Sequence, residues 1–158
     1  MCLDILDMPM ERGITLERAI SLVQKEKKEL SIETIHLDDS HGRILAEPLV
    51  SKVNDPRFDN SAMDGWAVRK EDFLESKSIN LSIVGISKAG ESSPPSVNSG
   101  EACKIMTGAP IPRGANAIVM VEDSEIHGNK VIISGPAREN YIRVKGENIS
   151  EGEVILSK

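Results

Sequence analysis

The sequence predicts an α+β protein with one N-terminal helix and a body built mainly of strands. Three observations lead to this fold class. The 158-residue chain is 39% hydrophobic but holds only two Phe, one Trp and one Tyr, so Ile, Val and Leu must dominate its core and favour strands. One stretch near the N-terminus has the apolar spacing of an amphipathic helix. Much of the remaining chain consists of short β-branched runs separated by Gly, Pro and Ser, the pattern of an antiparallel sheet or small barrel.

The helix is expected over residues 16–29. Thr15 can cap its first turn, and Glu17 in that turn suits the helix dipole. Four apolar residues would share one face: Leu16, Ala19, Ile20 and Val23.

The strands are expected to follow in order. A short strand at 33–37 precedes an apolar segment at 43–50, which can form only an edge strand because it contains a proline. Residues 51–65 are mostly turn formers and predict a long ordered loop or a domain crossing. Further strands are expected at 66–69, 80–86, 102–106, 117–121, 124–127, 130–134, 140–144 and 153–156. The Gly128-Asn129 pair predicts a two-residue hairpin.

Charge and composition narrow the classes of partner. The net charge of −6 argues against binding to a nucleic-acid backbone, so small molecules or proteins are the expected partners. Cys2 and Cys103 lack the spacing of a zinc site or a disulfide framework. The chain also lacks an apolar run long enough for a membrane span, and its start does not resemble a signal peptide. We therefore expect a cytoplasmic protein without a membrane partner.

Two aspartates mark the first segment of chemical interest, residues 58–68. Asp59 and Asp64 lie five positions apart among Gly, Ser and Asn. Such a loop can hold Mg²⁺ through one or two carboxylates together with substrate phosphate oxygens. The simpler interpretation is that Asp59 begins an Asx-turn and that Asp64 leads into the next strand.

A Thr-Gly turn after an apolar strand marks the second segment, residues 105–119. Thr107 offers a hydroxyl, and the turn offers free backbone N–H groups, which together suit an oxyanion or phosphate. The segment is not a P-loop, because no Gly-Lys-Ser/Thr follows. Its two nearby prolines also fit a merely rigid connection.

Two basic residues mark the third segment, residues 141–149. Arg143 and Lys145 alternate with apolar residues and would share one face of an extended chain, where they could receive an anion. The alternative is a solvated strand face that Glu139 and Glu147 neutralise.

Taken together, these segments resemble a known family. The strings DNSAMDGWAV (59–68), MTGAPIPRGANAIVMVED (106–123) and RVKGENI (143–149) are similar, in order and spacing, to the N-terminal region of the MoeA and gephyrin E-domain family of molybdopterin molybdenumtransferases. Residues 41–65 also resemble that family, so the likeness covers nearly the whole chain. It implies a transferase of molybdenum cofactor biosynthesis, which inserts molybdate into adenylylated molybdopterin with the help of Mg²⁺ and releases AMP.

The resemblance also implies site residues. By position in the motifs, Asp64 and Thr107 match the family's catalytic aspartate and threonine, and Asp64 is the expected metal ligand. The expected substrate-binding residues are Ser61, Gly108, Arg143 and Lys145. Two positions depart from the family pattern: Asn148 stands where an acidic residue is usual, and Lys145 where arginine is frequent.

The family's architecture implies the domain organisation. Residues 1–50 and 145–158 would build an elongated dimerisation segment, into which a β-rich subdomain, 51–144, is inserted. The family's pterin-binding α/β domain and its C-terminal β-barrel domain have no counterpart in the sequence. We therefore expect an N-terminal fragment or short relative that is inactive alone, forms a homodimer and has molybdopterin adenylyltransferase as a pathway partner. The alternative is a non-catalytic dimerisation or scaffolding module of the same family.

Overall fold

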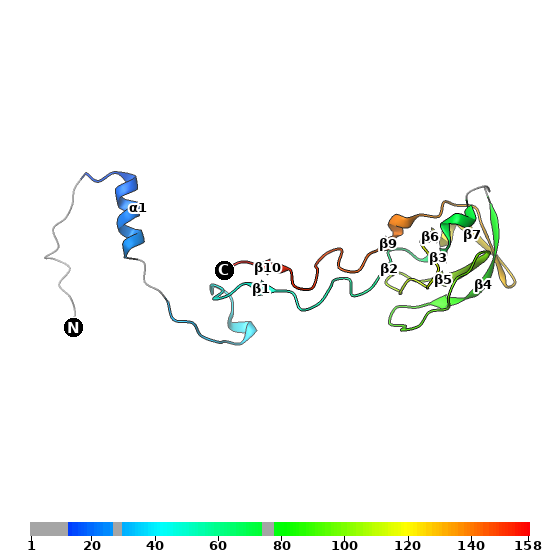
Figure 1. The fold of residues 1–158 in the computed structure, drawn as a ribbon, viewed down its shortest axis with the longest axis horizontal. Coiled ribbons are helices and arrows are strands. Elements are labelled where there is room, and N and C mark those ends of the chain that lie inside the picture. Colours follow the sequence, from blue (N-terminus) through cyan, green and yellow to red (C-terminus); the bar gives the residue numbers. More distant parts are fainter. Residues whose placement is uncertain (1–12, 27–29, 74–77) are drawn as a thin grey trace. The chain divides into compact units, whose positions relative to one another are not determined.

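The computed structural model describes residues 13–26, 30–73 and 78–158 (Figure 1). The chain divides into two compact units, Met1–Arg43 and Ile44–Lys158. Within the described residues there are one α-helix, several short 3-10 helices and ten strands. The predicted α+β class with a mainly β body therefore agrees with the structure.

The first unit contains the helix. Helix α1 spans Leu16–Lys25, and the hydroxyl of Thr15 accepts a hydrogen bond from the Arg18 N–H (3.3 Å), as expected of an N-cap. The helix ends at Lys25, earlier than predicted, because Glu26 already forms a turn. The rest of the predicted range, 27–29, lies outside the described residues.

The strand predicted at 33–37 is wrong. No strand in the described part of the chain pairs with this segment, and an isolated strand without a ladder is not stable in water. The chain instead forms a short 3-10 helix, η2 (Leu37–Asp39), capped by His36, whose Nδ1 accepts from the Asp38 N–H (3.3 Å). The side chains of Arg43 and Glu33 pair across this segment.

The second unit is built around a six-stranded sheet with the order β6-β3-β5-β4-β8-β7. Each of its strands lies within one residue of a run that the sequence predicts. The strands are β3 (Gly65–Val68), β4 (Ile79–Ser87), β5 (Glu101–Ile105), β6 (Ala117–Met120), β7 (Ser124–His127) and β8 (Lys130–Ile133).

Most neighbouring strands pair antiparallel, but β4 and β5 run parallel. The expectation of an antiparallel sheet is therefore wrong at this pair. Residues 88–100 return the chain from the end of β4 to a point beside its beginning, so β5 runs in the same direction as β4. The predicted hairpin is confirmed: Gly128 and Asn129 connect β7 to β8, with His127 opposite Lys130.

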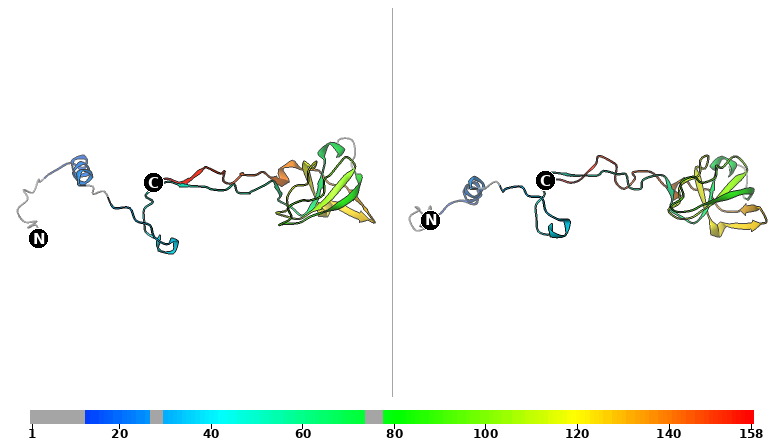
Figure 2. Two further views of the ribbon diagram at one scale, coloured as in Figure 1. Left: turned by 60° about the horizontal axis from the view of Figure 1, so that its bottom comes forward. Right: turned by 90° about the horizontal axis from the view of Figure 1, so that it is seen from below.

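The sheet is curled (Figure 2). Its edge strands β6 and β7 are joined by only three residues, the 3-10 helix η4 (Val121–Asp123). In addition, Nε1 of Trp66 on β3 donates to Oγ of Ser124 on β7 (2.9 Å). A short connection and a side-chain hydrogen bond therefore hold the two sides of a barrel-like body together.

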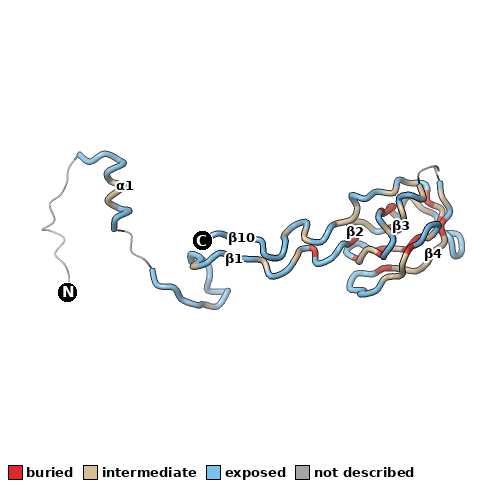
Figure 3. Tube along the Cα trace, viewed as in Figure 1, coloured by how far each residue is buried: buried red, intermediate tan, exposed pale blue. Residues whose placement is uncertain are grey.

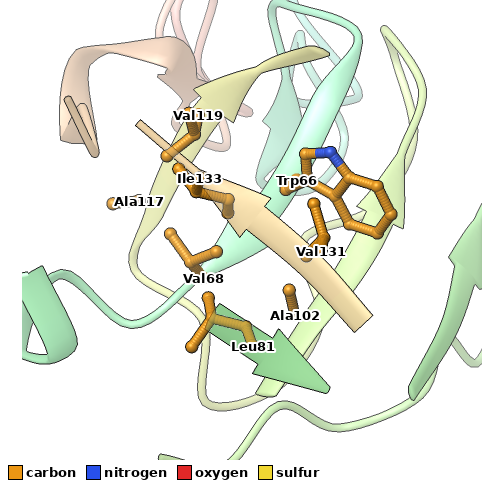
Figure 4. Close-up of a cluster of buried hydrophobic side chains, with 8 residues drawn as sticks. All are labelled: Trp66, Val68, Leu81, Ala102, Ala117, Val119, Val131 and Ile133. Atoms are coloured by element: carbon orange, nitrogen blue, oxygen red, sulfur yellow. The ribbon is translucent and has the colours of Figure 1, made fainter. Parts of the chain in front are cut away.

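Each face of the curled sheet carries its own apolar cluster, and the buried part of the chain is concentrated there (Figure 3). The first cluster combines Trp66 with aliphatic side chains from five strands (Figure 4), and it consists of Trp66, Val68, Leu81, Ala102, Ala117, Val119, Val131 and Ile133. The second cluster consists of Ala67, Val97, Cys103, Ile105, Ala109 and Ile118. As predicted, aliphatic residues supply most of the core.

Two short strand pairs extend the second unit. Strand β1 (Leu49–Val50) pairs antiparallel with β10 (Val154–Leu156), and β2 (Asn60–Ser61) pairs antiparallel with β9 (Ile142–Arg143). The strand predicted at 140–144 is shorter than expected, because a 3-10 helix, η5 (Glu139–Tyr141), occupies its beginning. A further 3-10 helix, η3 (Lys70–Phe73), follows β3. No helix in the described part of the chain is long and apolar enough to cross a bilayer.

Candidate functional site

The sheet brings Asp64 and Thr107 together, although they lie 43 residues apart. Strands β3 and β5 are antiparallel, with Gly65 opposite Ile105, so the residue before Gly65 and those after Ile105 meet at one end of the pair. Oδ1 of Asp64 accepts two hydrogen bonds from Thr107, one from its N–H (2.7 Å) and one from its hydroxyl (2.8 Å). The first two motifs therefore form one site.

The carboxyl of Asp64 is held in its ionised form. The Thr107 N–H, followed by the Thr107 hydroxyl, lowers the pKa of Asp64 below its usual value of 3.8; desolvation opposes this shift, and the charge of Lys104 adds to it. A carboxylate can only accept, so the Thr107 hydroxyl is the donor. Asp64 is exposed and presents an oriented negative charge to solvent.

Ser61 lies beneath the pair and connects the two loops. Its N–H donates to the carbonyl of Ala109 (3.0 Å), and its carbonyl accepts from the Gly108 N–H (2.8 Å). Its hydroxyl donates to the Met63 carbonyl (2.6 Å). Ser61 has no exposed surface, so this geometry assigns it to loop support, and its role in substrate binding stays a prediction.

The third motif reaches the same region through Arg143. Asn60 pairs with Arg143 on one side and bridges to Pro110 on the other, so the backbones of Arg143 and Pro110 lie about two strand spacings apart, roughly 10 Å. Arg143 is half-buried.

Lys145 does not share a strand face with Arg143, contrary to the expectation for an extended segment. Strand β9 ends at Arg143, and the Glu147 N–H donates to the Val144 carbonyl (3.0 Å) to close a turn around Lys145. The Lys145 N–H donates to Oδ1 of Asp59 (2.8 Å), which fastens this turn to the first motif. Asp59 therefore shapes the loop, and the exposed Lys145 side chain remains a predicted anion contact.

Asn148 is suited to its surroundings in this chain. Its side-chain amide donates to Oδ2 of Asp55 (2.9 Å), and its N–H donates to the Asp55 carbonyl (2.9 Å). An acidic residue at 148 would place two carboxylates side by side and raise the pKa of one of them. The departure from the family pattern is thus matched by a local contact.

The oxygen atoms of Asp64 could bind a divalent cation, provided that substrate and water supply most of the cation's other ligands. In the described segments, no three His, Cys, Asp or Glu side chains form a group that could hold a metal ion. Oδ1 of Asp64 is occupied by Thr107, whereas no described residue donates to its Oδ2. One carboxylate oxygen plus phosphate and water oxygens is a usual arrangement for Mg²⁺.

Sequence reasoning did not single out Ser87. This residue ends β4, has no exposed surface, and its hydroxyl donates to the carbonyl of Pro110 (2.8 Å) in the Thr107 loop. Ser87 directly follows the strand predicted at 80–86, and turn-forming residues such as serine are common at that place. The sequence therefore gives no sign that this serine contacts the loop that carries Thr107.

Removing the Thr107 hydroxyl should raise the pKa of Asp64. We expect a higher pKa in Thr107→Val, which keeps only the N–H donor, and a value close to that of the wild type in Thr107→Ser, as measured by ¹³C NMR titration of the Asp64 carboxyl. The lowered folded-state pKa makes ionised Asp64 stabilising above its usual value of 3.8, and this stability is lost as pH falls through the folded pKa. Equal pKa values in Thr107→Val and the wild type would contradict the hydroxyl contact.

Comparison with known proteins places this site in a family context. Residues 14–158 match the family model of the MoeA N-terminal region (domain I and II). The chain is 38% identical over 152 residues to a molybdopterin molybdenumtransferase of Synechococcus elongatus, covering 92% of this chain and 38% of that protein. It is 36% identical to the protein of that name in Haemophilus influenzae, covering 92% of this chain and 36% of the relative.

Solved structures give the same result. The crystal structure of the molybdopterin biosynthesis MoeA protein from Pyrococcus horikoshii OT3 superposes with a TM-score of 0.73 and 37% identity, over 80% of this chain and 34% of that one. The chain therefore spans less than two fifths of the length of the relatives and structures that it matches.

Proposed function

The chain belongs to the family of MoeA N-terminal regions, and we propose that it contributes the Asp64–Thr107 site to a transferase of molybdenum cofactor biosynthesis that inserts molybdate into adenylylated molybdopterin. The relatives are named molybdopterin molybdenumtransferase. The observation that carries the proposal is the contact between the two signature motifs: Thr107 donates twice to Asp64 and leaves an exposed, ionised carboxylate.

Asp64 acts through its free oxygen in this proposal. Oδ2 would hold a divalent cation, Mg²⁺, which when bound offsets the negative charge of phosphate or molybdate oxygens. Thr107 fixes the direction of the carboxylate and keeps it ionised, and so preorganises the negative charge before substrate arrives.

The anionic substrates would meet several groups near this carboxylate. We assign Arg143 and Lys145 to binding anionic oxygens, and Gly108 to contact through the exposed Thr-Gly turn. Ser61 supports that turn from below and contributes indirectly. These residues would position molybdate and the adenylylated pterin, and further substrate contacts would come from regions of the relatives that this chain does not span.

The proposed assembly is a homodimer in the cytoplasm, with molybdopterin adenylyltransferase as the pathway partner that supplies the adenylylated substrate. Pairing of β1 with β10 places residues 49–50, just before the proposed inserted region 51–144, next to 154–156 after it, which supports the limits of that insertion within the proposed dimerisation segment, 1–50 and 145–158. Large apolar side chains on these segments are exposed and suit a protein interface: Leu16, Ile20, Val23, Leu49, Ile155 and Leu156. These exposed side chains also favour the alternative, a non-catalytic dimerisation or scaffolding module.

A chimera distinguishes the two functions. Residues 14–158 replace the matching region of the Haemophilus influenzae relative, and the product is expressed in a bacterium that lacks its own enzyme. We expect the chimera to restore molybdenum-cofactor-dependent activity, because Asp64 and Thr107 are then combined with the remaining domains.

The 158-residue chain alone is the control, and it should give no activity above background because most of the substrate contacts are missing. A chimera that is folded and dimeric but inactive would refute the enzyme proposal and favour the scaffold. Turnover by the control chain would contradict our assignment of the substrate grip to other domains.

A further inference from the structure

We propose that Ser87 is a positioning residue for the Asp64–Thr107 pair; this inference rests on the proposed function of that pair. Ser87 holds the Thr107 loop near both of its ends. Its carbonyl accepts from the Met106 N–H (3.2 Å), and its hydroxyl donates to the Pro110 carbonyl (2.8 Å). Only 107–109 lie between these two contacts, so the loop has little freedom to shift.

A β-bulge turns Ser87 toward this loop. Before the bulge, Ile79, Leu81 and Ile83 on β4 contact the first apolar cluster. The register then shifts, so that Ile83 pairs with Ala102 and Gly85 pairs with Cys103, and Val84 is the extra residue.

Because Val84 is an extra residue, the side chains of β4 that follow it face the cluster opposite to the one that strict alternation predicts. Ser87 pairs with Ile105, which belongs to the second cluster, together with Ala109 of the Thr107 loop. Without the bulge, alternation would point Ser87 to the opposite face, away from Pro110.

Glycine is required at the bulge. Gly85 has a φ of +148°, and a Cβ at this position would lie 2.8 Å from Cγ of Pro95. The glycine therefore permits the bulge, and the bulge turns the buried hydroxyl of Ser87 toward the loop that carries Thr107.

Two buried serines thus clamp the loop from different strands. Ser61 on β2 exchanges backbone hydrogen bonds with Gly108 and Ala109, and Ser87 on β4 binds the segments before and after them. Because the Thr107 N–H and hydroxyl both reach Asp64, a shift of the loop would change both bonds at once.

Hydrogen exchange of the 158-residue chain, followed by NMR, tests this role. In Ser87→Ala, the Thr107 amide should exchange about tenfold faster, because the loop loses one anchoring hydrogen bond, while the core amides of β3 and β5 keep their protection. Ser82→Ala is the matched control on the same strand before the bulge, and it should leave the Thr107 amide unchanged. Ser87→Cys replaces the hydroxyl with a somewhat larger thiol that is a weaker donor, and it should give an intermediate rate.

Faster exchange confined to the Thr107 loop supports the proposal. An unchanged Thr107 amide in Ser87→Ala would overturn it, and so would an equal loss of protection at every amide, which marks general destabilisation. If Ser87→Ala does not fold, Ser87→Cys decides between the same outcomes. The hydrogen-exchange measurement contains no substrate. A negative result would therefore refute the role of Ser87 only, and the proposed transferase function would still be tested by the chimera.

Discussion

Asp64→Asn is expected to slow molybdate insertion by about 10²–10³-fold in the active chimera, the range seen when one preorganised electrostatic group is lost. The substitution is nearly isosteric, and the amide oxygen can still accept from the N–H and hydroxyl of Thr107. The substitution removes the negative charge and replaces Oδ2, the proposed ligand for a cation, with an NH₂ group that can only donate. Steady-state measurement of kcat and kcat/KM, with thermal unfolding followed by circular dichroism, separates this loss from a loss of folding.

Asp59→Asn is the matched control, because it makes the same change five positions earlier in the same loop. Asp59 accepts from the Lys145 N–H through Oδ1, and an asparagine oxygen can replace that contact. We expect kcat to remain within about tenfold of the starting value. Equal losses in the two variants would show that general loop charge, rather than the Asp64 carboxylate, carries the effect.

The fold was predictable where the information is local. Runs of β-branched residues between turn formers located the six strands of the main sheet, and Gly128-Asn129 located the hairpin. The errors come from non-local contacts. The parallel pairing of β4 with β5 depends on the path of 88–100, and the segment at 33–37 has strand-like residues but no partner strand among the described residues.

The site shows the same division. Motif resemblance singled out Asp64 and Thr107 as candidates, but their contact follows from the register of β3 against β5, which the sequence pattern does not specify. Ser87 was missed for a related reason: a one-residue bulge reverses its face, and strict alternation predicts the wrong side. The prediction that Arg143 and Lys145 share a strand face was wrong, because β9 ends at Arg143.

Gly65, next to Asp64, illustrates how a turn signal can conceal a packing constraint. In sequence the Asp-Gly pair indicates a turn before a strand, but Gly65 is already part of β3 and pairs with Ile105 on one side and Met120 on the other. It is buried, and a Cβ at this position would overlap the carbonyl oxygen of Val119 and lie 3.1 Å from Cα of Met120. The constraint is therefore the close approach of β3 to β6.

Gly65→Ala should destabilise the chain by about 3 kcal/mol or more, because relief of the overlap requires the buried first residue of β3 to move away from β6. The midpoint of thermal unfolding, followed by circular dichroism, should fall by about 10 °C. Gly100→Ala is the informative comparison: Gly100 has a φ of +77° but open space around it, so alanine adds only backbone strain of about 1–2 kcal/mol. A larger loss in Gly100→Ala than in Gly65→Ala would mean that backbone conformation, and not the contact with Val119, determines where this sheet needs glycine.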